Sequence, residues 1–335
     1  MTRESGERSR RASKRHVVVV CNPTKKGIEA VRKKIDAQVE KHGFARPVWI
    51  ATHASDGGVS AAKRALDRHP DLVIAVGGDG TVRAVAEVFG GSGIPVGIIA
   101  RGTGNLLARN LDIPVGDVRA MTRLAFEGST RGIDIAHMET DGPMGPKSTI
   151  FLVMAGLGLD AAMAAMTNPK LKQRIGWLAY LGPIFQASLK NEKKTLTVVL
   201  ESGERSERRQ HTAMIGNCGV LAGGFLLMPD AKVDDGLLDV LALDPKTIWG
   251  WTRIARRIAV GSALRKSPNK SEILRGLPRV TSMRYRQAPR VEWHMESPVM
   301  VQVDGDAFGE VSSAIFTVRH QSLLVCVPNS SGHAK

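Results

Sequence analysis

The sequence contains few cysteines and opens without an apolar leader. Its three cysteines, Cys21, Cys218 and Cys326, are odd in number, far apart and not in metal-ligand spacing. This pattern argues against a disulfide framework or a zinc site, so we expect reduced thiols in a cytoplasmic protein. Residues 1–5, Met-Thr-Arg-Glu-Ser, lack the apolar core of a signal peptide, and we expect none.

No apolar run is long enough to predict a transmembrane helix. The longest candidate, residues 150–166, is short, carries Asp160 and is interrupted by Gly156 and Gly158. A buried strand followed by a turn and a helix is the better interpretation. The nine histidines show no ligand spacing, and no Ser-His-Asp arrangement rises above chance, so neither a histidine metal centre nor a catalytic triad is predicted.

Positive charge is abundant but local. The formal net charge is +15. Residues 1–15 hold six Lys/Arg against two Glu, and residues 246–290 hold twelve against Glu272 alone, so these two segments account for the whole excess. The rest of the chain is neutral, which indicates that the positive charge serves these two segments and is not a general solubility feature. We expect residues 1–15 to form a disordered basic tail.

Two apolar strands each run into a glycine-rich turn. Residues 71–76 precede Gly-Gly-Asp-Gly-Thr at 77–81, and residues 94–100 precede Arg-Gly-Thr-Gly-Asn at 101–105. Glycines reach positive φ and let N–H groups approach a ligand closely, and a helix that begins at the turn favours anions. Two such turns at one edge of an α/β sheet predict a polyphosphate site. Neither has Walker or Rossmann spacing, so P-loop and dinucleotide interpretations lose support.

Hydrophobic periodicity divides the chain into two parts. Residues 16–133 alternate apolar strands with amphipathic helices, which predicts a doubly wound α/β nucleotide-binding domain. Residues 134–318 read as an antiparallel β-sandwich with helical insertions. The expected strands are 16–21, 45–51, 71–76, 94–100, 133–138, 149–156, 195–200, 210–218, 237–243, 278–287, 299–304, 312–318 and 322–328, and the expected helices are 27–42, 57–69, 81–90, 105–126, 158–190 and 246–264.

With the loop at 22–27, Asn-Pro-Thr-Lys-Lys-Gly, the two glycine turns resemble the diacylglycerol kinase and sphingosine kinase family of lipid kinases. Two later segments, 229–240 and 301–306, strengthen the resemblance, which covers nearly the whole chain. It implies that the last strand, within 319–330, returns to the first domain. It also implies ATP and Mg²⁺ as cofactors and a membrane lipid as substrate.

The resemblance implies a nucleotide site at the three loops. Asp79, on an exposed turn, would face the catalytic Mg²⁺ or its water shell, since a carboxylate is a hard ligand. Thr52 matches a family contact, and a surface hydroxyl at a strand end is an equally good interpretation of it. The implied nucleotide contacts are Asn22, Pro23, Thr24, Lys25, Thr52, Gly77, Gly78, Asp79, Gly80, Thr81, Gly102, Thr103 and Asn105.

Acidic residues near the end of the chain match the family's catalytic pair. The family usually has Glu where Asp306 stands, preceded by Asp-Gly, so Asp304 corresponds to the partner acid. We predict that Asp306 takes the proton of the lipid hydroxyl, with the division of roles between the two acids left open. An ordinary turn between strands is the alternative. Asp160 corresponds to a family acid near the acceptor, and a helix cap is the competing account.

A second metal site is implied in the sandwich. Asp235 would be the side-chain ligand of a structural Mg²⁺, with the carbonyls of Lys232 and Leu237, because Mg²⁺ prefers oxygen ligands. Asp-Asp-Gly at 234–236 is equally typical of a hairpin turn, and the two interpretations are compatible.

The basic segment has two interpretations of about equal weight. Residues 247–261 place Trp251, Ile254, Ala255 and Ile258 on one helical face. Beside or across from that face are three arginines, Arg253, Arg256 and Arg257. An amphipathic helix packed on the sandwich, with a solvated charged face, explains this pattern. A helix that docks on an anionic membrane, with tryptophan at the interface, explains it as well.

We therefore predict a kinase of phospholipid metabolism that phosphorylates diacylglycerol or a related lipid, is cytoplasmic, and contacts the membrane peripherally. No nucleic-acid partner is expected, and a homodimer is left open. The alternatives are a sphingoid-base or other lipid kinase, a NAD kinase, and a non-catalytic nucleic-acid or membrane-binding protein. Asp235 and the acids at 304–306 argue against the last two. Arg83 and Leu106 depart from the family's usual residues and weaken the substrate assignment.

Overall fold

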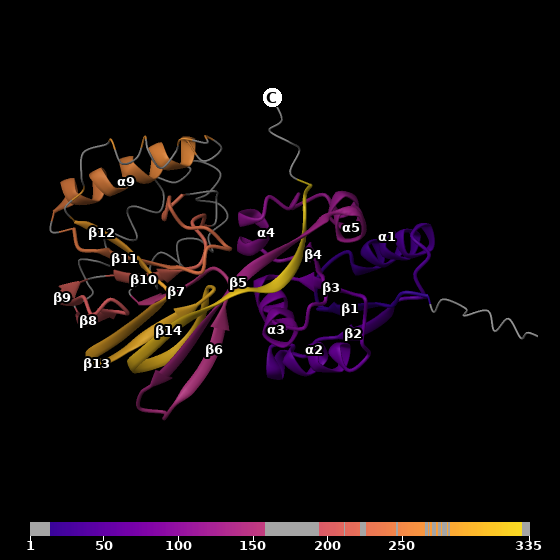
Figure 1. Ribbon diagram of the computed structural model, residues 1–335, viewed down its shortest axis with the longest axis horizontal. Coiled ribbons are helices and arrows are strands. Elements are labelled where there is room, and N and C mark those ends of the chain that lie inside the picture. Colours follow the sequence, from indigo (N-terminus) through magenta and orange to yellow (C-terminus); the bar gives the residue numbers. More distant parts are fainter. Residues whose placement is uncertain are drawn as a thin grey trace, which may run out of the picture.

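The computed structural model contains two lobes joined by long strands (Figure 1). It describes residues 14–157, 194–210, 212–221, 226–245, 247–264 and 282–329, with single residues at 267, 269, 273, 276 and 280. Residues 1–13 of the predicted tail lie outside the described residues. So do Asp160 and the helix expected at 158–190.

The N-terminal lobe is a parallel sheet with helices on both faces. Its strands run in the order β4-β3-β1-β2, and all three neighbouring pairs are parallel. Strands β1, β3 and β4 are apolar and buried along their length, as expected when both faces are covered, whereas the edge strand β2 is half-buried and ends exposed at Ala51. Helices α1 and α5 pack together on one face, and α2 and α3 on the other (Figure 1). The elements are β1 (Val17–Cys21), α1 (Ile28–Lys41), β2 (Val48–Ala51), α2 (Val59–Leu66), β3 (Leu72–Gly77), α3 (Asp79–Phe89), β4 (Val96–Ala100), α4 (Leu106–Asn110) and α5 (Val118–Glu127).

The C-terminal lobe is antiparallel and encloses an aromatic core. The Trp293 and Phe316 rings meet edge to face with centroids 4.8 Å apart, and Phe151 lies 6.2 Å from Phe316. All three side chains are fully buried. The elements are β5 (Ser129–Asp141), β6 (Lys147–Phe151), β7 (Met154–Leu157), β8 (Lys194–Leu200), β9 (Arg205–Gln210), β10 (Thr212–Gly216), β11 (Leu238–Leu243), α9 (Ile248–Ala263), β12 (Met283–Ala288), β13 (Arg290–Val303) and β14 (Asp306–Val327).

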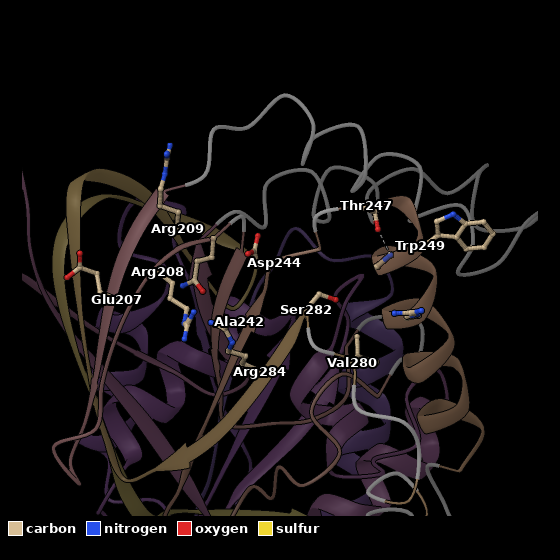
Figure 2. A pocket seen from close by; sticks show the side chains of 13 residues that line it. Glu207, Arg208, Arg209, Ala242, Asp244, Thr247, Trp249, Val280, Ser282 and Arg284 are labelled. Carbon is tan, nitrogen blue, oxygen red and sulfur yellow. Dashed lines mark hydrogen bonds between the residues drawn. The ribbon is translucent and has the colours of Figure 1, made fainter.

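Helix α9 packs on this lobe through one apolar face. Ile254 and Ala255 are buried and Ile258 is partly buried, whereas Arg253 and Arg256 are exposed. The side chain of Trp251 is outside the described part of the helix. A cavity of about 740 Å³ lies between this helix, β9 and β12 (Figure 2).

Strands β5 and β14 join the two lobes. They pair with each other from Ser313 opposite Asp141 to Val327 opposite Ser129, with one register shift after Arg319. Near its end β14 also pairs with β4 in parallel, with Val325 opposite Val96. The described strands thus form one 14-stranded sheet, and the far end of β14 completes the N-terminal lobe.

The predicted fold class is confirmed, and several boundaries differ. The helix expected at 105–126 is two helices, α4 and α5, because Pro114 and Gly116 fall between them. The strand expected at 149–156 is divided into β6 and β7. Strand β9 was not expected, because five of its six side chains are exposed or half-buried and show no alternation.

Candidate active site

The three predicted phosphate loops lie together at one edge of the sheet. Strands β1, β3 and β4 are adjacent and parallel, so their carboxyl ends meet. The amide of Asn22 donates to Val76 O at 3.0 Å, and that of Arg101 to Gly77 O at 2.6 Å. The Arg101 guanidinium also donates to Lys26 O, which connects the loop at 101–105 to the loop at 22–27. This edge is where open α/β sheets bind ligands.

The two glycine turns touch each other. A Cβ at Gly102 would lie 2.6 Å from Gly78 Cα, so a side chain there would require the turns to separate. Among Gly77, Gly78, Gly80 and Gly102, none has a positive φ. The expectation that the glycines serve through positive φ is therefore wrong for these four, and for Gly78 and Gly102 the role is close approach of the two backbones.

Asp79 connects the two turns. Its carboxylate accepts the amides of Asn105 at 2.7 Å and Leu106 at 2.6 Å, at the N-terminus of α4. Burial raises the pKa of Asp79, and these backbone hydrogen bonds oppose the rise. The expectation of an exposed turn is wrong, because Asp79 is half-buried and its carboxylate accepts two amides of the second glycine turn. A role beside Mg²⁺ stays a prediction.

Some of the remaining predicted nucleotide contacts form hydrogen bonds within their own loops, and the others are described by their exposure. Asn105 closes its own loop, since its side chain accepts from Gly102 N at 2.8 Å and donates to Gly102 O at 2.9 Å. Thr24 likewise donates to the Asn22 side chain at 2.7 Å. Thr52 and Thr81 are buried, while Pro23 and Thr103 are exposed and Lys25 is half-buried.

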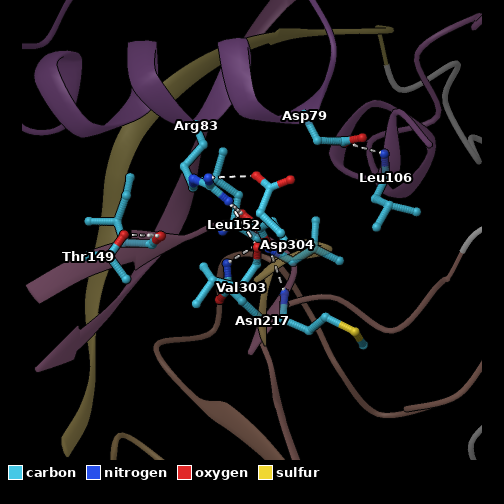
Figure 3. Close-up of polar contacts among 12 residues, drawn as sticks. Asp79, Arg83, Leu106, Thr149, Leu152, Asn217, Val303 and Asp304 are labelled. Carbon is cyan, nitrogen blue, oxygen red and sulfur yellow. Dashed lines mark hydrogen bonds and ion pairs between the residues drawn. The ribbon is translucent and has the colours of Figure 1, made fainter. Parts of the chain in front are cut away.

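Asp304 is buried and organises the backbone around it. Its side chain is 2% exposed and accepts the amides of Leu152, Val153 and Met154 at 2.9 to 3.1 Å (Figure 3). Burial raises the pKa of Asp304, and these bonds together with Arg83 oppose the rise. Its φ of 48° places it in the left-handed region. This arrangement explains why the chain turns between β6 and β7.

Asp306 faces the phosphate loops. Its side chain is 65% exposed, and Oδ2 lies 4.0 Å from the position that a Cβ would take at Gly80. Arg83 of α3 forms an ion pair with Asp306 at 2.8 Å and donates to Val303 O at 3.0 Å. The structure therefore brings Asp306 to the first glycine loop and holds Asp304 behind it.

Sequence reasoning noted Arg83 as a departure from the family and did not place it in the site. Figure 3 shows it reaching from α3 toward the β13–β14 turn. Its Nη1 is 4.0 Å from Asp304 Oδ2, so one guanidinium lies beside both acids. Nothing local predicts this contact, because the partners are more than two hundred residues apart in sequence.

Several aspartates lie at or beside the loop at 232–237, away from the pair Asp304 and Asp306. Asp134 is fully buried and accepts Gly236 N at 2.7 Å and Gln321 N at 2.6 Å, with His320 Nδ1 at 3.0 Å. Sequence reasoning missed Asp134. Its signal was a lone carboxylate between two isoleucines of a buried strand.

The donor set of this loop fits a hard cation. Burial raises the pKa of Asp235, and the Asp134 charge adds to the rise. Burial and the Asp235 charge raise the pKa of Asp239 to about 7, and Asp239 Oδ2 has no hydrogen-bond partner in the described part of the chain. A cation would relieve these carboxylates. Across the described ranges no three His, Cys, Asp or Glu side chains form a metal-binding group, so the predicted set needs the Lys232 and Leu237 carbonyls.

Solved structures share this architecture. A diacylglycerol kinase from Bacillus anthracis str. Sterne has a TM-score of 0.65 at 18% identity, covering 93% of this chain and 96% of that one. Yeast NADH kinase has a TM-score of 0.54 at 12% identity, covering 96% and 85%. The fold is thus one that diacylglycerol and NADH kinases share.

Sequence comparisons narrow this class to a family. Residues 16–138 match the diacylglycerol kinase catalytic domain, and residues 153–327 match the YegS C-terminal NAD kinase beta sandwich-like domain. The chain therefore belongs to the diacylglycerol kinase and YegS-like family of lipid kinases. The Pseudomonas aeruginosa PAO1 protein named "Probable lipid kinase YegS-like" is 31% identical over 231 residues, covering 68% of this chain and 72% of that protein.

Several relatives are named diacylglycerol kinase, two of which illustrate the range of coverage. That of Bacillus subtilis is 26% identical over 316 residues, covering 92% of this chain and 95% of the relative. That of Mycobacterium tuberculosis H37Rv is 29% identical over 176 residues, and the match spans 52% of this chain and 56% of the relative. The match thus spans little more than half the length of the mycobacterial relative.

Proposed function

We propose that the protein transfers the γ-phosphoryl group of ATP to the hydroxyl of diacylglycerol or a related membrane lipid, with Mg²⁺. The observation that carries this proposal is the exposed Asp306 carboxylate beside the Gly80 loop. A base at a phosphate-binding turn is the arrangement that phosphoryl transfer to an alcohol needs.

Each part of the site has a role in this reaction. The backbone amides of the touching glycine turns would hold the phosphates, and Asp79 would keep the two turns in place. The lipid oxygen bonds to the γ-phosphorus as the bond from that phosphorus to the β–γ bridging oxygen breaks. Asp306 accepts the hydroxyl proton, and ADP leaves with the bridging oxygen. Mg²⁺, held near Asp79 and the phosphates, would neutralise the charge that develops on the leaving group.

Two other acceptors remain to be compared with diacylglycerol. A sphingoid base or another lipid alcohol would use the same groups. A nicotinamide nucleotide is the second candidate, since the fold is shared with yeast NADH kinase. The family assignment favours a lipid. None of the helices in the described part of the chain could span a bilayer.

A phosphorylation assay with labelled ATP and Mg²⁺ tests the proposal. Diacylglycerol in detergent micelles, a sphingoid base, a total lipid pool and NAD⁺ would be offered separately, with Asp306→Asn as the control enzyme. We expect label in a lipid product, most strongly with diacylglycerol, and a loss of label with the variant. Label in NAD⁺ alone, or in no acceptor, would overturn the proposal.

A further inference from the structure

A cavity lined by arginines lies away from the candidate active site. Arg208 and Arg209 of β9, Arg253 of α9 and Arg284 of β12 surround the hollow of about 740 Å³ (Figure 2). We call these four residues and the hollow the arginine cavity. None of its lining residues belongs to the phosphate loops or to the acidic pair. Strand β12 is the third strand from β7 in the sheet order.

Positive side chains outnumber negative ones in the described lining of the arginine cavity, where the four arginines stand beside two carboxylates, Glu207 and Asp244. Within the described ranges, none of its four guanidinium groups has an ion pair. Glu207, at the rim, accepts Thr197 Oγ1 at 3.3 Å and lies 3.8 Å from Arg205. The described lining therefore has an excess of positive charge, and an anion between the guanidinium groups lowers their mutual repulsion. Guanidinium groups match phosphate oxygens in pairs, so a phosphate is the anion that fits best.

An apolar groove continues from the arginine cavity. Leu196, Val198, Leu200 and Val240 line one part of a second hollow of about 180 Å³, which shares Arg208 and Arg284 with the first. Glu204 and Arg286, which form an ion pair at 3.3 Å, also line it. A charged hollow joined to an apolar one matches a molecule with an anionic head and a hydrocarbon chain.

The rim of the arginine cavity carries an exposed tryptophan. Trp249, in the first turn of α9, is 73% exposed (Figure 2). Indole rings are enriched where a protein surface meets lipid head groups, because one side of the ring is apolar and the N–H is polar. Sequence reasoning pointed to Arg253, Arg256 and Arg257 for membrane contact, and the structure places only Arg253 at the cavity.

We propose that the arginine cavity binds the phosphate head group of an anionic phospholipid in the membrane, with Trp249 in the interface. This lipid is not the kinase substrate. It holds the sandwich lobe against the bilayer while the acceptor enters elsewhere. The proposal deepens the proposed function, and its test needs no catalysis.

Sedimentation with vesicles tests the arginine cavity directly. Vesicles of phosphatidylcholine alone would be compared with vesicles containing phosphatidylglycerol, at 0.1 M salt without nucleotide. We expect wild-type binding to require phosphatidylglycerol. Arg208→Gln/Arg284→Gln should weaken it by about 30-fold, since each basic residue near an anionic surface contributes about 1 kcal/mol. The matched control, Arg119→Gln/Arg123→Gln on exposed positions of α5, removes the same charge and should bind nearly as wild type.

Three results would overturn the proposal. They are an equal loss of binding in both double variants, wild-type binding by the cavity variant, and arginine-dependent binding of inorganic phosphate without vesicle binding. Thermal melting of each variant establishes that it is folded. Both variants should retain activity on diacylglycerol dispersed in detergent. Vesicle binding by a wild type that phosphorylates no lipid would contradict the proposed function and leave the arginine cavity standing.

Discussion

Asp304 and Asp306, which are separated by Gly305, have opposite environments. Asp304 is enclosed by three backbone amides, whereas Asp306 is largely exposed at the glycine loop. An exposed carboxylate can meet an incoming hydroxyl, and an enclosed one cannot without breaking its own bonds. The exposed position of Asp306 agrees with a base, a role that stays a prediction, while Asp304 holds the backbone at 152–154.

Substitution separates these two duties. Asp306→Asn should lower kcat by about 10²-fold or more, the usual range for loss of a general base, with the melting temperature unchanged. Asp304→Asn should lower the free energy of unfolding by about 1–3 kcal/mol, because the NH2 group of Asn replaces one of the two oxygens that accept buried backbone amides. Initial rates and urea denaturation measure both. Loss of activity in the stably folded Asp304 variant, with full activity in the Asp306 variant, would reverse the roles.

Arg83 holds Asp306 from the opposite lobe, so its removal should act through Asp306. Arg83→Gln should lower kcat about fivefold, since a largely exposed ion pair is worth at most about 1 kcal/mol. In the Asp306→Asn background the same change should have little effect, because the pair is already broken. A double-mutant cycle on kcat checks this. Independent, additive effects would show that Arg83 acts on something else.

At the scale of elements, the short helix α4 depends on a residue outside it. Five residues form too short a helix to be stable alone, and Asp79 supplies acceptors for amides at its start. Asp79→Ala should abolish phosphoryl transfer and also cost about 1–3 kcal/mol of folding stability, because these amides lose their acceptor. Thermal melts beside rate assays test this. Full activity would contradict the assignment of this turn to the nucleotide.

The loop at 232–237 offers a test of metal binding without catalysis. If Asp235 holds a structural Mg²⁺, then Mg²⁺ without nucleotide should raise the melting temperature of the wild type and not that of Asp235→Ala, since a ligand of the native state alone stabilises it. Ca²⁺ and a matched ionic strength of NaCl serve as controls. An equal Mg²⁺ response in both proteins would leave only the turn interpretation.

At the scale of the whole molecule, the parts that local pattern determines were predictable. Buried strands such as β1 and β3 are continuous apolar runs, and the glycine turns follow them directly. Two contacts could not be predicted, that of Arg83 with the acidic pair and that of Asp134 with His320, because each joins residues far apart in sequence. Strand β9 was missed because its charged side chains are mostly exposed, so no apolar alternation marks it; two of them, Arg208 and Arg209, line the arginine cavity.

The continuous sheet predicts how the molecule unfolds. Strands β5 and β14 belong to both lobes, so neither lobe can lose its structure without exposing the core of the other. We expect one calorimetric transition, with the van't Hoff enthalpy equal to the calorimetric enthalpy. Two resolved transitions would show that the lobes are independent in spite of their shared strands.

The pairing of β14 with β4 also bears on how the protein is synthesised. Domains usually fold in the order in which the ribosome makes them. Here β14, the strand that covers the edge of β4, is translated long after the rest of that lobe. The edge of β4 is therefore unpaired in the nascent chain until β14 is made. An unpaired strand edge can pair with other chains. A product that stops before residue 319 would contain every phosphate loop and still lack the strand that completes their sheet. Translation of the last strand thus determines when the nucleotide-binding lobe can finish folding.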